Sequence, residues 1–236
     1  MSEGARRARR LWLIDRLTRF WADDKGLTGF SLLLFIVIFV IPPLLEPGSG
    51  RRPAAEVAYA LLLVSGVLAL GQRSAIRWVL MSMALVTLAV DLGSFVVVVP
   101  EVWVEGTGVL SLLLFVVVVL GQTLREGPVT FHRIQGAIAA YLLLGVIWAY
   151  AYSLLAHLSP GAFSGAVNTA DGPRGWFYFS FVTLTTVGYG DVLPVHPWAR
   201  SLAMMESVIG SLYLAILVAR LVGLAVTPPT RGSAKP

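Results

Sequence analysis

Cysteine is absent from this chain of 236 residues, and only 13% of its residues are charged. The lack of cysteine excludes a disulfide scaffold, and the low charge excludes an intrinsically disordered chain. Hydrophobic residues make up 57% of the sequence. A water-soluble domain of this size has too little interior to hide that much apolar surface. The composition therefore predicts an integral membrane protein.

Long stretches with little or no charge predict an all-α fold, because a spanning helix needs about 20 mostly apolar residues. Six spans are predicted, at residues 26–45, 57–72, 76–99, 106–124, 134–158 and 200–226. Two of them contain an acid, Asp91 and Glu206, and acids inside a membrane are functional candidates by default. Residues 175–190 are apolar and aromatic but too short to cross, which predicts a re-entrant segment.

The basic residues predict how the spans are oriented. With both termini in the cytosol, the inner segments hold 14 Lys and Arg and the outer segments hold four. The chain is therefore expected in the plasma (inner) membrane as a multi-pass protein. Residues 1–27 are basic and amphipathic, which predicts contact with an anionic inner leaflet. Nucleic acid is not an expected partner, because a membrane span follows this segment at once.

The re-entrant segment ends in the sequence TTVGYGD, residues 185–191, which is the signature of potassium channels. The chain resembles the potassium-channel superfamily over residues 134–226, in the six-helix form with one pore loop, and its compact size is typical of prokaryotic members. The resemblance implies a homotetramer, since four loops must surround one ion path. It also implies a pore helix over residues 175–185 and a filter over residues 186–190.

The resemblance implies that K⁺ is the permeant ion and that backbone carbonyl oxygens replace its hydration water. The implied filter residues are Thr186, Val187, Gly188, Tyr189 and Gly190. Their carbonyls all face one axis only if alternate residues take unusual dihedral angles, which glycine tolerates. The implied supporting residues are Thr185, Asp191, Tyr178 and Thr183.

The sequence departs from the family near the filter. Many members have two Trp where this chain has Tyr178 and Phe179, and Phe179 has no donor for the filter tyrosine. Tyr178 is the expected hydrogen-bond partner of Asp191, and Thr183 is in reach of Tyr189. These departures predict that the aromatic residues pack less firmly around the filter and that the ion preference is unchanged.

The sixth span contains the expected gate. Gly210 matches the hinge glycine of the family, and an apolar stripe that closes a pore by dewetting follows it. The stripe consists of Leu214, Val218 and Val222. An alternative interpretation is ordinary packing, with Gly210 at a close helix contact. Two roles stay open for Glu206, namely tuning of the cavity potential and hydrogen bonding behind the filter.

Residues 28–124 occupy the place of a voltage-sensing domain, but residues 106–124 contain no Lys or Arg. Each charge that crosses the field yields about 2.3 kcal/mol per 100 mV, so little voltage dependence is expected. Asp91 resembles the acid of such domains without their basic partners. Residues 125–133 form a cytosolic linker and residues 227–236 a short tail. His157 and His196 are either proton-sensitive groups or ordinary surface and packing residues.

The sequence thus predicts a potassium-selective channel with little intrinsic voltage dependence. The alternative is a non-conducting or regulatory membrane subunit that modifies other channels. A potassium transporter would repeat the helix–loop–helix unit four times in one chain, and this chain contains it once. An enzyme is not expected, because the chain has no metal cluster, paired carboxylates or Ser–His arrangement at reachable spacing. No organic cofactor is expected.

Overall fold

The computed structural model of the chain describes residues 24–41, 74–93, 100–123, 131–165, 167 and 175–226. These residues are mostly helical, as the all-α prediction requires. The helices are α2 (Asp24–Phe35), the π-helical turn η1 (Ile36–Val40), α5 (Ser74–Gly93), α6 (Glu101–Thr123), α7 (Phe131–Leu158), α8 (Phe177–Leu184) and α9 (Pro197–Val226). Two short strands, β1 (Phe163–Gly165) and β2 (Val192–Pro194), form an antiparallel pair that the sequence did not predict.

Several predicted parts lie outside the described residues. They are the basic N-terminal segment, the second span at residues 57–72, residues 125–130 of the linker, and the tail at residues 227–236. The backbone of Asp91 lies in α5, but its side chain is also outside the described part.

Three described helices are long and apolar enough to cross a membrane. Their apolar portions are Val102–Gly121, Ile134–Leu158 and Pro197–Arg220, and each matches a predicted span to within a few residues. The portions of α2 with η1 and of α5 are apolar but shorter, at Thr28–Val40 and Trp78–Val90. The chain is therefore a membrane protein, and the number of six spans stays a prediction.

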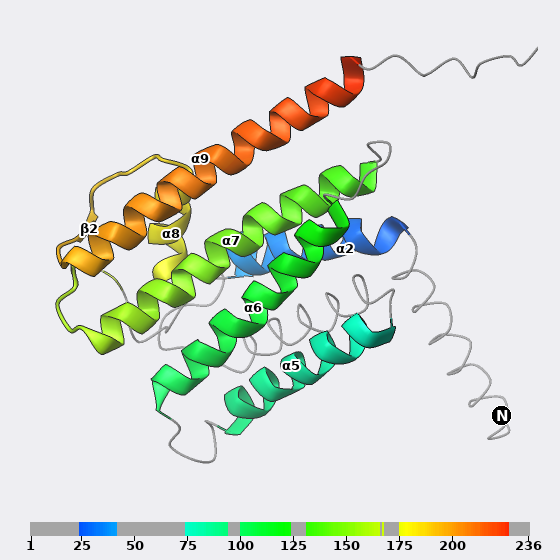
Figure 1. Cartoon of the computed structure of the whole chain (residues 1–236). Helices are drawn as coiled ribbons and strands as arrows, with labels where there is room; N and C mark the ends of the chain where they lie inside the picture. Colours follow the sequence, from blue (N-terminus) through cyan, green and yellow to red (C-terminus); the bar gives the residue numbers. More distant parts are fainter. Residues whose placement is uncertain are drawn as a thin grey trace, which may run out of the picture.

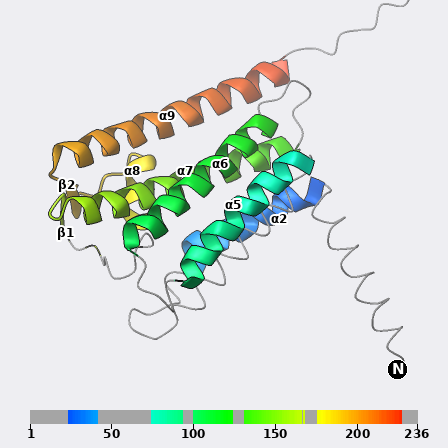
Figure 2. The same cartoon turned by 60° about the horizontal axis from the view of Figure 1, so that its bottom comes forward.

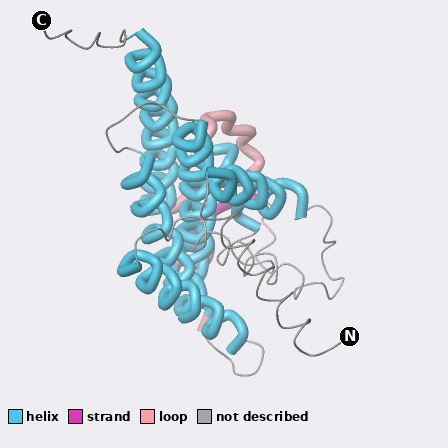
Figure 3. The backbone as a smooth tube through the Cα atoms, turned by 90° about the vertical axis from the view of Figure 1, so that its right-hand side faces the viewer, coloured by secondary structure: helices cyan, strands magenta, loops and turns pink. Residues whose placement is uncertain are grey.

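Helix α7 lies at the centre of the fold and contacts α2, α6, α8 and α9. Figure 1 shows α9 running antiparallel to α7, with the short helix α8 between them near the β2 end. The view in Figure 2 agrees, and it places α5 and α2 on the opposite side of α7 from α9. The C-terminal part of α9 extends beyond the other helices, which Figure 3 shows from the side.

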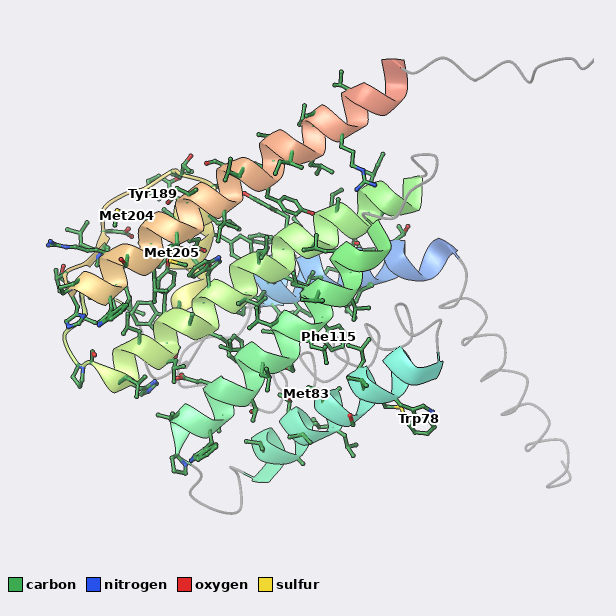
Figure 4. The ribbon with its side chains drawn as sticks, in the orientation of Figure 1. Trp78, Met83, Phe115, Tyr189, Met204 and Met205 are labelled. Carbon is green, nitrogen blue, oxygen red and sulfur yellow. The ribbon has the colours of Figure 1, made fainter. Side chains whose placement is uncertain are left out.

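Small residues explain why the neighbours of α7 approach it so closely. A Cβ atom at Gly108 would overlap the ring of Tyr150, so α6 lies tightly against α7 at this point. Ala137, Ala139 and Ala140 of α7 are buried as well. In a membrane, small residues let helix backbones approach, and dispersion contacts then stabilise the pair. By contrast, Trp78 on α5 points away from the other helices (Figure 4) and is 63% exposed.

The strand pair β1–β2 joins the loop after α7 to the segment after the filter. Gly165 lies opposite Val192 in this pair and has a φ of +111°. A Cβ atom at Gly165 would overlap the carbonyl oxygen of Asp191, so only glycine fits there. The pair therefore fixes the segment that follows the predicted filter to the fold.

Candidate functional site

Helix α8, the predicted pore helix, ends in a Schellman-type cap that starts the predicted filter segment. The backbone N–H of Thr186 donates to Thr183 O at 3.0 Å, and that of Val187 donates to Val182 O at 2.9 Å. This pattern requires a left-handed residue just after the helix, and Thr186 has a φ of +61°. Glycine usually occupies such a position, because a side chain there is strained. The cap therefore turns the chain sharply out of the helix at Thr186.

The filter segment alternates between two kinds of backbone conformation. Thr186, Gly188 and Gly190 have φ values of +61°, +57° and +81°, and they are the only described residues between α8 and β2 with positive φ. Alternation of this kind turns successive carbonyls toward the same side. The amides of Val187 and Gly188 both donate to Val182 O, at 2.9 and 3.3 Å, so they point back at the pore helix. The alternation at Gly188 and Gly190 was expected from the sequence, whereas that at Thr186 was not.

Two tyrosines and an acid lie together at the end of the predicted filter segment that leads into β2. The rings of Tyr178 and Tyr189 are parallel, with centroids 6.2 Å apart. A hydrogen bond between the Tyr178 hydroxyl and the Asp191 carboxylate is the main cause that raises the pKa of Tyr178. In the described part of a single chain, Thr183 forms no hydrogen bond with Tyr189. Tyr178 thus lies beside Asp191, and the role of this pair in supporting the filter stays a prediction.

Phe179 fills the space behind the pore helix with apolar contacts. It is buried, and its ring meets Tyr152 of α7 edge-on at 4.8 Å and Phe163 of β1 at 5.6 Å. Trp176 is buried in the same aromatic group. The phenylalanine that lacks a donor is therefore part of a dense aromatic cluster within the same chain, an arrangement that sequence reasoning did not find.

A second aromatic contact connects the pore helix with the first described helix. Gly145 of α7 leaves room for Phe181, because a Cβ atom there would lie 2.5 Å from the Phe181 ring. The ring of Phe39, in η1, meets Phe181 edge-on with centroids 5.0 Å apart. The pore helix thus packs on both α7 and the segment that precedes residue 42.

Helix α9 contacts the pore helix through three positions within one stretch of its sequence, Glu206, Ser207 and Gly210. Ser207 donates to Thr183 O at 3.2 Å, and Glu206 lies against Ser180. A Cβ atom at Gly210 would overlap the carbonyl oxygen of Leu184, so α9 and the end of α8 touch backbone to backbone. This contact supplies a packing reason for Gly210, and its role as a hinge stays a prediction.

Glu206 is fully buried at the meeting point of three helices. Its Oε2 atom lies 2.5 Å from the hydroxyl of Tyr152 on α7, and its Oε1 atom lies 2.6 Å from Oγ of Ser180 on α8. Ser180 Oγ is also 2.7 Å from the carbonyl oxygen of Gly145. The carboxyl group therefore lies behind the pore helix and contacts no described part of the filter backbone.

The expected gate residues lie in the C-terminal half of α9. Leu214, Val218 and Val222 are exposed and follow one another at four-residue intervals. Nothing in a single chain covers this stripe among the described residues, and its role as a gate stays a prediction.

A buried acid on α6 was missed by sequence reasoning. Glu105 is 2% exposed and accepts a hydrogen bond from Ser153, and its Oε2 atom lies 3.1 Å from Nδ1 of His157. Both partners lie on α7, so the group links α6 to α7. An acid next to an apolar run could have marked Glu105 as a candidate. Its partners lie about 50 residues away on α7, so nothing in the sequence indicated them.

The second candidate histidine, His196, begins helix α9. Its Nδ1 atom accepts a hydrogen bond from the N–H of Trp198 at 3.3 Å, and Pro197 occupies the first helical position. A side-chain acceptor before the helix and proline at its first position both favour helix initiation. His196 thus has a structural role as the N-cap of α9.

We expect replacement of Glu105 with leucine to weaken the contact between α6 and α7. The change removes hydrogen bonds to Ser153 and His157, and interhelical hydrogen bonds in membranes are worth about 0.6 kcal/mol each, up to about 1.7. Thermal unfolding of the purified protein in detergent measures the loss. Thr107→Val is the matched control, because Thr107 bonds only to carbonyls of its own helix. Equal melting temperatures for wild type and the Glu105 variant would contradict the prediction.

The part of the chain that contains this site matches a known protein family. Residues 137–226 match the family described as "Ion channel". This part of the chain is similar to ion-channel domains. It contains most of α7, the helix α8, the segment that follows α8, and α9, and the match indicates a channel and not an enzyme.

One curated relative also matches the chain. The inward rectifier potassium channel Kirbac3.1 from Paramagnetospirillum magnetotacticum is 33% identical over 109 residues, which are 44% of this chain and 32% of that protein. The chain thus spans about a third of the length of this relative. No solved structure is significantly similar to the chain. Residues 137–226 are therefore the part of the molecule for which the family comparison supports a channel.

Proposed function

We propose that the chain is one subunit of a homotetrameric, potassium-selective channel. The observation that carries this proposal is the alternation of positive φ at Thr186, Gly188 and Gly190 directly after the pore helix. Alternation aims successive backbone carbonyls at one side, where four copies of the segment surround one axis. Rings of carbonyl oxygens then replace the hydration shell of K⁺. Thr186, Val187, Gly188 and Tyr189 supply these carbonyls, and the segment runs to Gly190.

Exposure of the filter and of α9 in a single chain supports an assembly of several copies. Only 11% of the apolar portion of α9 is buried, compared with 56% of that of α7. Tyr189 is 71% exposed, although a filter needs fixed packing around this residue. Neighbouring subunits that cover these surfaces explain both exposures, and a four-fold ring is the arrangement that one loop per chain requires.

Helix α6 supports a channel with little intrinsic voltage dependence. It occupies the position of the helix that carries gating charges, yet Glu101–Thr123 contains no Lys or Arg. Its buried charged residue is the acid Glu105. Without basic residues to move across the field, a membrane potential does little work on this helix. We therefore assign the first four spans to a sensor-like domain without gating charges.

The proposed orientation places both termini in the cytosol of the plasma (inner) membrane. It rests on the excess of Lys and Arg in the segments assigned to the inner side. The basic N-terminal segment then lies against anionic lipid. The filter segment and the strand pair β1–β2 face the outside in this arrangement.

Flux measurements on the purified full-length chain in liposomes test the proposal. We expect potassium flux at least about tenfold faster than sodium flux, which corresponds to about 1.4 kcal/mol of discrimination, with little steepness in voltage. Equal fluxes of the two ions would overturn the selectivity. A steep rise of open probability with voltage would overturn the role given to α6. No flux at all would favour a non-conducting or regulatory subunit.

A further inference from the structure

If the Glu206 carboxyl group were ionised, the short oxygen–oxygen contacts around it would outnumber the hydrogens available to bridge them. Three oxygen–oxygen contacts meet there: Tyr152 to Oε2 at 2.5 Å, Ser180 to Oε1 at 2.6 Å, and Ser180 to Gly145 O at 2.7 Å. Each short contact between oxygens needs one hydrogen. The Tyr152 hydroxyl supplies the first, and the Ser180 hydroxyl supplies only one of the other two.

The missing hydrogen has one possible source among these groups. A backbone carbonyl has no hydrogen, so the contact between Ser180 and Gly145 uses the hydrogen of the serine. The contact between Ser180 and Oε1 then needs a hydrogen on the Glu206 carboxyl group. An ionised carboxylate would leave two oxygens facing each other at 2.6 or 2.7 Å without a hydrogen between them.

The surroundings of Glu206 also favour a neutral group. The side chain is fully buried, and no Lys, Arg or His nitrogen of the described residues lies within ion-pairing distance of it. The titratable groups that face it are Tyr141 and Tyr152 of α7. Burial of a charge without a partner is costly, whereas a neutral acid with satisfied hydrogen bonds is not.

We propose that Glu206 is a protonated carboxylic acid that positions the pore helix from behind. The Tyr152 hydroxyl donates to Oε2, the acid donates from Oε1 to Ser180, and Ser180 donates to Gly145 O. This chain of donors joins α7, α8 and α9 and leaves none of the side-chain hydroxyls unsatisfied. The inference rests on the proposed function, because its consequence is read at the selectivity filter.

A change in the position of α8 affects the filter segment because hydrogen bonds at the capped end of α8 hold the start of that segment. The amides of Val187 and Gly188 both donate to Val182 O, two residues after Ser180. Ser207, adjacent to Glu206, binds the Thr183 carbonyl of the same helix. A shift of α8 at Ser180 therefore moves the backbone that carries the filter carbonyls. Glu206 is a positioning residue in this arrangement, since it touches no ion path itself.

Infrared spectroscopy of the full-length protein in liposomes tests the protonation directly. We expect wild type to show the C=O stretching band of a protonated carboxylic acid, and Glu206→Gln to lack it. Asp191→Asn is the control for the band, because it removes an exposed carboxyl group. Absence of the band from wild type, or a band of unchanged intensity in Glu206→Gln, would overturn the inference.

The ion selectivity of Glu206→Gln and of a second variant, Glu206→Leu, tests the positioning role. The glutamine amide donates to Ser180 and accepts from Tyr152 as a neutral acid does, so we expect Glu206→Gln to keep wild-type selectivity. Glu206→Leu loses both interhelical bonds, and we expect about a tenfold loss of potassium over sodium preference. Loss of selectivity in the glutamine variant would overturn the role. Wild type without potassium flux would instead overturn the proposed function, and the infrared band would still decide the protonation.

Discussion

Replacement of Gly210 with alanine is expected to lower the stability of the protein and to disturb the filter. The added Cβ atom would overlap the carbonyl oxygen of Leu184 and lie 2.9 Å from its Cδ1 atom. The carbonyl belongs to the backbone at the end of the pore helix, so it does not swing aside as a flexible side chain does. Overpacking of this kind costs about 1–3 kcal/mol. Thermal unfolding in detergent and potassium flux in liposomes measure the two effects.

The sign of the stability change separates close packing from a simple hinge. If Gly210 served only to let α9 bend, alanine would favour the straight helix by up to about 1 kcal/mol and raise the melting temperature. Gly121→Ala and Gly106→Ala are matched controls on α6, since a Cβ atom at either site meets nothing within 4 Å. We expect both controls to be neutral or stabilising. A more stable Gly210→Ala protein that opens poorly would contradict the packing explanation.

The long helices are the part of the fold that the sequence predicts best. Runs of apolar residues bounded by charges or by Pro and Gly locate α6, α7 and α9, because a membrane imposes length and composition directly. The shorter apolar parts of α2 and α5 are predicted less well. Their neighbours include residues outside the described part, so composition alone does not determine where they end.

The filter could be predicted only in part, for reasons of backbone geometry. Gly188 and Gly190 indicate positive φ, because glycine adopts it without strain. Thr186 gives no such indication, and its left-handed conformation follows from the cap at the end of α8. Residue type therefore predicts a positive φ where glycine allows it, but not where the helix cap imposes it.

Contacts between distant segments are the part that sequence reasoning missed. Glu105 meets Ser153 and His157 only because α6 lies against α7. Gly165 lies against Asp191 only because β1 pairs with β2. Neither pattern repeats along the chain, so no periodicity marks it. Both follow from tertiary contacts that bring distant segments of the chain together.

Replacement of Gly188 with alanine is expected to abolish selective potassium conduction, and a matched glycine shows why. Gly188 and Gly161 have φ values of +57° and +82°, and an added Cβ atom meets nothing within 4 Å at either position. Each alanine thus carries a similar strain of about 1–2 kcal/mol, because a left-handed conformation is disfavoured with a side chain. The two variants should lose similar stability in thermal unfolding.

Their effect on ion flux should differ, because only Gly188 lies in the filter segment. Four copies of Gly188→Ala in the proposed ring would each relax the strain by turning a carbonyl away from the axis, which removes ligands for K⁺. Gly161 lies in the loop after α7, where the same relaxation changes no carbonyl of the filter. We therefore expect Gly161→Ala to conduct potassium as wild type does. Equal losses of selective flux in the two variants would mean that strain alone, and not the direction of the filter carbonyls, controls conduction.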